Sequence, residues 1–311
     1  MVGDMSTTLA KSSIRKKLIR DRALYLLLLP GILYYILFKY LPMYGILIAF
    51  QDYSFGKGIF ASQWVGLEHF IKFFSGDKAF ILIRNTVLLS VNNLLWGFPA
   101  PIILALLLNE LKSNRFKRIV QTVSYLPHFI STVIVVGMLV NFVSPSSGIV
   151  NVILRRLGHE PIFFMSKPEW FRPLYIGSEI WQQVGWGTIL YLAAITGINP
   201  ELYEASYIDG AKRLQQIRYI TIPSIFPVIA TLFILNTGRM LTIGAQKVIL
   251  MYNPLIYETA DIIDTYVYRR GILSADFSFA AAVGFFQSLI GLLLVISANK
   301  ISKRFSETSL W

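Results

Sequence analysis

Long apolar runs alternate with short polar stretches along the whole chain. A helix needs about 20 mostly apolar residues to cross the hydrocarbon core of a bilayer. Six segments meet that requirement, near residues 24–49, 86–108, 119–142, 175–197, 224–244 and 278–299. The first is too long for a signal-peptide core, and no small-residue cleavage site follows it. The pattern therefore predicts an all-α integral membrane protein with six transmembrane helices.

The composition agrees with a membrane protein and restricts its chemistry. The 311 residues are 55% hydrophobic and 15% charged, whereas soluble domains carry about 25% charged residues. The chain has no cysteine, which excludes disulfides and thiolate metal sites. The histidines at 69, 128 and 159 have no metal-ligand spacing, so we expect no metal site.

Basic residues cluster in four short segments that six spans would bring to one side of the membrane. More than half of the 29 lysines and arginines lie in residues 11–22, 112–118, 212–218 and 300–304. Cytoplasmic loops carry such an excess, so both termini are expected in the cytoplasm. This role accounts for the net charge of +12 without nucleic-acid binding.

Several motifs of catalysis and nucleotide binding are missing. The chain has no G-x-x-x-x-G-K-[ST] loop for phosphate, no H-E-x-x-H and no G-x-S-x-G. We also identify no Asp or Glu inside the apolar spans, where proton-driven carriers usually need one. These absences argue against an enzyme. They also weaken the case for a self-sufficient secondary transporter or channel, which stays the alternative function.

A polar block, ELYEASYIDGAKRLQQIRYITIP, separates the fourth and fifth apolar segments at residues 201–223. We expect a helix up to Ile208, a break at Asp209-Gly210 with Asp209 capping the next helix, and an end at Pro223. From the pattern alone, two interpretations stay open. The block either forms a rigid contact for a partner or lies as an amphipathic helix on the membrane surface.

The block resembles the EAA motif, E-A-x-x-x-D-G-A followed by I-x-x-P, of permease subunits of binding-protein-dependent ABC importers. The matching residues are Glu204, Ala205, Asp209, Gly210, Ala211, Ile220 and Pro223, with Ser206 where many members have alanine. Three further segments are similar to the carbohydrate branch of these permeases, of the polysaccharide or lipo-oligosaccharide type. They are LLPGILYYILFKYLPMYGILIAFQDY, NPLIYETADIIDTYVYRRGI and SADFSFAAAVGFFQSLIGLLLVISANKISKRFSETSLW.

This resemblance implies a type I importer bundle of the MetI-like kind in a bacterial cytoplasmic membrane. Its expected regions are a basic tail at 1–22, a first span with an extracytoplasmic segment at 23–79, a five-helix permease core at 80–302 with the coupling loop at 199–223, and a tail at 303–311. The coupling residues would be those of the motif together with Leu214.

The same resemblance implies several partners. They are a second homologous permease (a different chain, or a second copy), two ATPase subunits, an extracytoplasmic sugar-binding protein and an oligosaccharide substrate. ATP and Mg²⁺ would bind on the ATPase subunits, and this chain would hold no cofactor.

Three groups of polar and aromatic residues inside the spans are candidates for a sugar path. Amides can bind hydroxyl groups, and aromatic faces can bind the C–H side of a sugar ring. The candidates are Asn92, Asn93 and Trp96; Gln182, Gln183 and Trp186; and Asn236 and Arg239. Each could instead form helix–helix hydrogen bonds, and each tryptophan could anchor the interface. Arg239 could face an acidic sugar or extend to the interface.

Overall fold

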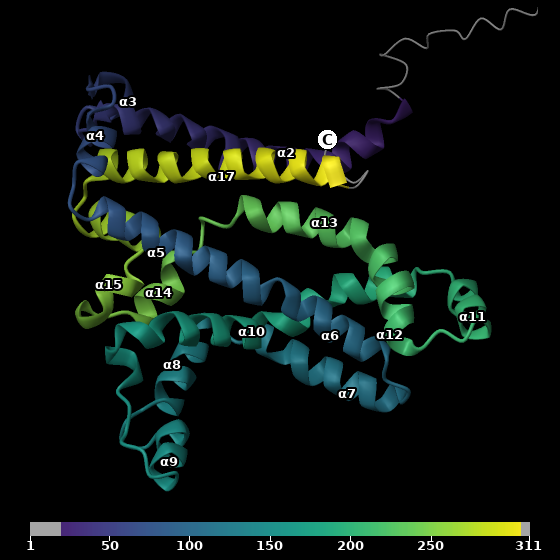
Figure 1. Ribbon diagram of the computed structural model, residues 1–311. Coiled ribbons are helices and arrows are strands. Elements are labelled where there is room, and N and C mark those ends of the chain that lie inside the picture. The colour runs from purple at the N-terminus through teal and green to yellow at the C-terminus, as the bar shows by residue number, and fades with distance from the viewer. Residues whose placement is uncertain (1–19, 306–311) are drawn as a thin grey trace, which may run out of the picture.

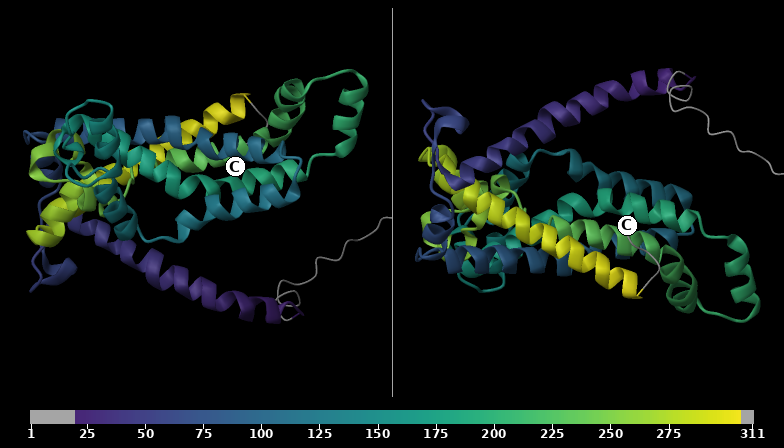
Figure 2. Two further views of the ribbon diagram at one scale, coloured as in Figure 1. Left: turned by 90° about the horizontal axis from the view of Figure 1, so that it is seen from below. Right: turned by 90° about the horizontal axis from the view of Figure 1, so that it is seen from above.

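The computed structural model describes residues 20–305, most of them in helices (Figure 1). Most of the predicted basic N-terminal tail, and the residues after 305, lie outside the described part of the chain. The first helix runs continuously through α2 (Arg22–Tyr35), η1 (Ile36–Tyr40) and η2 (Leu41–Phe50). Its η2 end packs against α17, whereas its α2 end diverges from the bundle (Figure 2).

Long helices side by side form the bundle. They are α5 (Ala79–Asn92), η3 (Asn93–Gly97), α6 (Pro99–Asn109), α7 (Asn114–Tyr125), α10 (Pro168–Thr196), α13 (Ile222–Gly238) and α17 (Phe277–Phe305). The central helix is α10, which contacts α6, α7 and α13, while α17 packs on α13 from the other side. Each of these helices presents an apolar face to its neighbours, which favours burial of that face.

Four helices in the described part of the chain are long and apolar enough to cross a membrane: Arg22–Phe50, Ala79–Asn109, Arg213–Gly238 and Phe277–Lys303. They correspond to the first, second, fifth and sixth predicted segments. The fourth predicted segment lies in α10, which has 29 residues but carries Glu179, Gln182 and Gln183 near its centre. Polar side chains thus make α10 less apolar than these four helices.

The third predicted span, 119–142, is not one straight helix. The helix Asn114–Phe129, which includes η4 (Leu126–Phe129), meets α8 (Thr132–Phe142) at an angle of 103°. Pro127 lacks an N–H group, and Ile130 is extended. The Ser131 hydroxyl then accepts a hydrogen bond from Ile134 N and starts α8 as its N-cap. Counted as one bent span, this pair raises the number of helices in residues 20–305 that are long and apolar enough to cross a membrane to five, and α10 is the remaining predicted segment.

Short elements gather at one end of the bundle (Figure 1). They are the strands β1 (Gln51–Asp52) and β2 (Gln63–Trp64), and the helices α3 (Gly58–Ala61), α4 (Glu68–Phe74), α9 (Ile149–Arg156), η5 (Phe164–Ser166), α14 (Ala245–Met251), η7 (Pro254–Ile256), α15 (Tyr257–Ala260), α16 (Ile263–Tyr268) and η8 (Arg269–Leu273). The strands pair antiparallel, with Gln51 opposite Trp64. At the other end lie α11 (Pro200–Ile208) and α12 (Arg213–Gln216).

An apolar core closes the end that carries the short elements. It joins α5, α8, α10 and α14 to the segment around α15, and its buried members include Leu89, Val136, Phe171, Met251 and Ile262. A second cluster joins α6, α10 and α13 near the opposite end, around Leu108, Tyr191 and Ile225. The space between these two clusters is where the bundle opens into a cavity.

A buried ion pair stabilises the segment between α15 and η8. Two nitrogens of the Arg269 guanidinium donate to the two carboxylate oxygens of Asp261, at 2.5 and 2.9 Å. The rings of Tyr252, Tyr257 and Tyr266 lie 5.0 to 5.9 Å from the guanidinium carbon. Such a bidentate pair satisfies the charge of the buried Asp261 carboxylate, while the Arg269 side chain stays partly exposed.

Candidate coupling loop and substrate cavity

The coupling loop bends at Asp209-Gly210, where the sequence predicted a break. Helix α11 starts at its N-cap Asn199, whose Oδ1 accepts a hydrogen bond from Glu201 N at 3.1 Å. It ends in a Schellman motif, in which Gly210 N donates to Tyr207 O and Ala211 N to Ser206 O. Gly210 has φ of +78°, a conformation that favours glycine.

Two details of the predicted loop are wrong. Asp209 is the C-cap of α11, and the N-cap of α12 is Lys212, whose backbone N–H donates to Gln215 Oε1. Pro223 does not end the helix, because the chain continues through it from the π-helical turn that precedes it into α13. Helices α12, η6 (Ile217–Thr221) and α13 therefore form one continuous helix, Arg213–Gly238.

Most of the motif residues are exposed on the outer side of the loop. Glu204, Ala205, Asp209, Gly210, Leu214 and Pro223 are exposed, while Ala211 and Ile220 are half-buried. Leu214 is 80% exposed, and Tyr207 and Ile208 at the end of α11 are exposed to a similar degree. A recess of about 250 Å³ lies within the bend, lined partly by Asp209, Gly210, Ala211 and Ile220. Exposed apolar side chains of this kind mark a surface for a partner.

Side-chain hydrogen bonds join α11 to the start of the continuous helix. The Tyr203 hydroxyl lies 2.9 Å from Thr221 Oγ1, and Gln216 Nε2 donates to Ser206 Oγ at 2.9 Å. Arg213 also forms an ion pair with Glu110, at the end of α6, at 2.7 Å. A displacement of α11 would therefore be transmitted to α13 and to the loop after α6.

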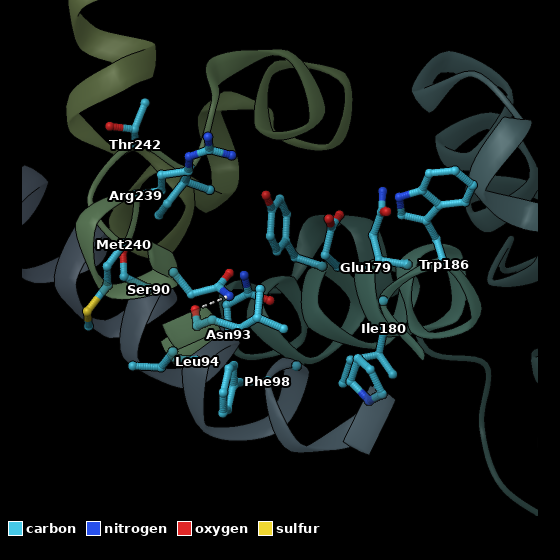
Figure 3. Close-up of a pocket in the computed structure, with 18 of the residues that line it drawn as sticks. Ser90, Asn93, Leu94, Phe98, Glu179, Ile180, Trp186, Arg239, Met240 and Thr242 are labelled. Atoms are coloured by element: carbon cyan, nitrogen blue, oxygen red, sulfur yellow. Dashed lines mark hydrogen bonds between the residues drawn. The ribbon is translucent and has the colours of Figure 1, made fainter. Parts of the chain in front are cut away.

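A cavity of about 640 Å³ lies among α5, η3, α10 and α13 (Figure 3). Five of the eight predicted path residues line it: Asn93, Gln183, Trp186, Asn236 and Arg239. The hydroxyl of Ser90 and the rings of Tyr175 and Tyr191 add further polar and aromatic surface. The cavity thus combines amide groups, hydroxyl groups and aromatic faces, as a sugar site requires.

The other three predicted path residues lie outside this cavity. Asn92 Nδ2 donates to Leu88 O of its own helix, and Trp96 is exposed on the surface of the bundle. Gln182 is buried and donates its Nε2 to Ile130 O at the bend before α8. Gln182 thereby satisfies a carbonyl group that the bend removes from regular helical hydrogen bonding.

His128, from η4, contacts two of the cavity residues and was not predicted as a site residue. Its Nδ1 lies 2.8 Å from Gln183 Oε1, and its ring stacks on the indole of Trp186. With Nδ1–H donating to Oε1, the Gln183 amide nitrogen stays available as a donor. No sequence pattern links His128 to residues more than fifty positions away. Its role could be identified only once the structure showed η4 packed against α10.

The absence of acidic residues from the spans was also a wrong prediction. Glu179 lies within the fourth segment, in α10, and forms part of the cavity wall. Its Oε2 is 2.7 Å from Lys247 Nζ on α14, which is only 6% exposed. Lys247 Nζ also lies 4.9 Å from the ring centroid of Tyr175. Burial lowers the pKa of the Lys247 amine, and the charge of Glu179 opposes that shift.

Arg239 is the C-cap of α13 and lines the cavity as an exposed side chain. It forms no ion pair with any residue between 20 and 305. Its position at a helix C-terminus is favourable for a cation. No group of three or more histidine, aspartate or glutamate side chains in the described residues is placed to bind a metal ion.

Comparisons with known proteins agree with this architecture. Residues 97–307 match the family described as binding-protein-dependent transport system inner membrane component. The polygalacturonan/rhamnogalacturonan transport system permease protein YteP of Bacillus subtilis is 48% identical over 295 residues, which cover 95% of this chain and 92% of that protein. Protein LplB of the same organism is 47% identical, over 94% of this chain and 92% of that protein.

The structure is also similar to a solved transporter. A chain of a bacterial alginate ABC transporter, crystallised in complex with its alginate pentasaccharide-bound periplasmic protein, has a TM-score of 0.88 and 44% identity. The similarity covers 96% of this chain and 100% of the other. The helical bundle is thus matched across nearly the whole length of the chain. The chain belongs to the family of binding-protein-dependent transport system inner membrane components and is a permease subunit of an ABC importer.

Proposed function

We propose that this permease imports an acidic oligosaccharide, one that carries uronic acid residues. The observation that carries the proposal is Arg239, a cation without an ionic partner among residues 20–305, in the wall of a cavity lined by amides and aromatic rings. A guanidinium group binds a carboxylate through two parallel hydrogen bonds. Relatives named for polygalacturonan, rhamnogalacturonan and alginate transport support the same substrate class.

The cavity residues would divide the recognition of such a substrate. Arg239 would bind a carboxylate, and Asn93, Gln183 and Asn236 would form hydrogen bonds with hydroxyl groups. The exposed part of the Trp186 ring would contact the apolar face of a sugar. Aromatic faces are suited to this contact because sugar C–H groups lie against the negative face of the ring.

The transport cycle would be driven through the coupling loop. Two ATPase subunits bind ATP and Mg²⁺, and one of them receives the exposed surface of α11 around Glu204 and Gly210. Because α11 is bonded to Thr221 and Gln216, its movement would shift α13, which carries Arg239 at its far end. An extracytoplasmic binding protein would deliver the sugar to the opposite end of the bundle. A second homologous permease would complete the path.

In this arrangement the coupling loop and both termini face the cytoplasm. The basic residues of 112–118 and 212–218 support that orientation, because the Arg213–Glu110 ion pair puts both segments at one end of the bundle. The short elements around α9 and α15 would then face outward, where the binding protein docks.

Transport by the complete complex in liposomes tests the proposal. Acidic oligosaccharides and their carboxyl-reduced, neutral counterparts would be compared in complexes with wild-type permease, with Arg239→Gln and with Arg115→Gln, a control at an exposed residue in the first turn of α7. We expect Arg239→Gln to lower acidic uptake by about tenfold or more and neutral uptake far less. An equal loss for both substrates would remove Arg239 as the charge-recognising residue. A wild-type complex that imports only neutral sugars would refute the substrate class.

A further inference from the structure

The cavity wall contains two charged side chains of opposite sign, Arg239 and Glu179. Figure 3 shows Glu179 between Arg239 and Trp186 in this view. A free carboxylate at this position would repel an anionic substrate and would compete with it for Arg239. Within the described residues, however, Glu179 already has a cationic partner, Lys247, at 2.7 Å. Lys247 does not line the cavity itself and approaches Glu179 from behind the wall.

Lys247 is held there by the apolar core. Helix α14 places the neighbouring residues Val248 and Met251 in the buried cluster that closes the bundle. The ring of Tyr175 covers the Lys247 ammonium group on one side, and Glu179 accepts its hydrogen bond on another. A lysine buried without such partners would be strongly destabilised in its charged form. The site is therefore built to hold a positive charge directly behind Glu179.

We propose that Lys247 is a specificity-determining residue, which neutralises Glu179 and leaves the cavity with the unopposed positive charge of Arg239. This inference rests on the proposed acidic substrate. Lys247 acts through Glu179 and does not touch the sugar. The ion pair thus allows Glu179 to keep its place in the wall, where its exposed part can accept hydrogen bonds from hydroxyl groups, without excluding a carboxylate.

The proposal predicts opposite effects for the two members of one ion pair. Lys247→Met removes the cation at nearly constant length and leaves Glu179 as a free negative charge. Glu179→Gln removes the anion and leaves Lys247 as a second positive charge behind the wall. A purely structural ion pair predicts the same direction for both changes, since either one breaks the same contact. The ratio of acidic to neutral uptake separates these two cases.

The experiment uses complete complexes in liposomes with matched acidic and carboxyl-reduced oligosaccharides. We expect Lys247→Met to lower the ratio of acidic to neutral uptake by about tenfold, and Glu179→Gln to raise it by about threefold. The double variant Glu179→Gln/Lys247→Met is expected to return the ratio to about the wild-type value. Lys247→Arg keeps the charge and serves as the control that should leave the ratio unchanged.

The outcomes separate this inference from the proposed function. If the wild-type complex imports the acidic sugar and Lys247→Met lowers the uptake of both substrates equally, the role of Lys247 is structural and the inference fails. If the wild-type complex does not import the acidic sugar, the proposed function itself fails. Should Lys247→Met not assemble, Glu179→Gln decides alone: a raised ratio supports the inference, and an unchanged or lowered ratio overturns it.

Discussion

The imidazole ring of His128 lies flat on the indole ring of Trp186, with centroids 4.5 Å apart and planes inclined by 3°. The same imidazole binds Gln183 through Nδ1. A side chain from the bend before α8 therefore orients two residues on the cavity face of α10. This contact also fixes which face of the Trp186 ring stays open to a substrate.

We expect His128→Ala to raise the KM of sugar uptake by about tenfold, because both Trp186 and Gln183 lose their support. An aromatic contact is worth about 0.5–1.5 kcal/mol and a hydrogen bond about 1 kcal/mol, which together correspond to a factor of about ten or more. His128→Phe keeps the ring contact and loses the hydrogen bond, so its KM should lie between the KM of the wild type and that of His128→Ala. Initial uptake rates across a range of substrate concentrations measure the effect. If both variants matched the wild type, His128 would have no positioning role.

Gly210→Val should separate ATP hydrolysis from transport. The φ of +78° makes a non-glycine residue cost about 1–2 kcal/mol or more, although no atom lies within 4 Å of the position of an added Cβ. The loop is exposed, so we expect normal membrane insertion but an altered bend between α11 and α12. ATP hydrolysis per sugar imported should rise sharply in liposomes. Gly137→Val, at an exposed glycine with ordinary φ, is the control, and normal transport by Gly210→Val would contradict the coupling role.

The local features of this protein were predictable, because each depends on a short stretch of sequence. The bend at Gly210 follows from a glycine after a helix-forming run, and the four apolar spans follow from composition. The five residues that do line the cavity were identified from polar and aromatic groups inside apolar segments. Each of these patterns is complete within one continuous segment of the chain.

Besides the local errors at Asp209, Glu179 and Pro223, the missed features concern relationships between distant segments. Glu179 stands within the predicted fourth segment itself, but its ion pair with Lys247, 68 residues away on a short helix outside the spans, could not be read from the sequence. The bend at Ile130 depends partly on Gln182, which satisfies the Ile130 carbonyl group from another helix. His128 acts on residues of α10 through the same bend. Packing in three dimensions therefore decided which polar residues serve the cavity and which serve the fold.

The ion pair of Asp261 and Arg269 should be essential for the stability of the segment around α15. Arg269→Met leaves Asp261, which is 7% exposed, as an unpaired buried charge, and the expected cost is about 3–5 kcal/mol. The adjacent Arg270→Met is the matched control, because the pair of Arg270 with Asp276 is more exposed and should contribute about 1 kcal/mol or less. Thermal unfolding of the purified complex should show a lower midpoint for Arg269→Met. Equal midpoints for the two variants would contradict the prediction.

Two glycines on α10 test how closely this helix packs on α7. A Cβ added at Gly185 would lie 2.0 Å from Ser124 O, whereas one added at Gly177 would have no atom within 4 Å. The carbonyl belongs to the backbone and cannot rotate away, so Gly185→Ala must push α7 from α10, at a cost of about 1–3 kcal/mol or more. Gly177→Ala should be neutral or slightly stabilising, since alanine favours a helix. Melting of the purified complex should therefore distinguish them, and a Gly185→Ala variant as stable as Gly177→Ala would mean that α7 and α10 do not meet there.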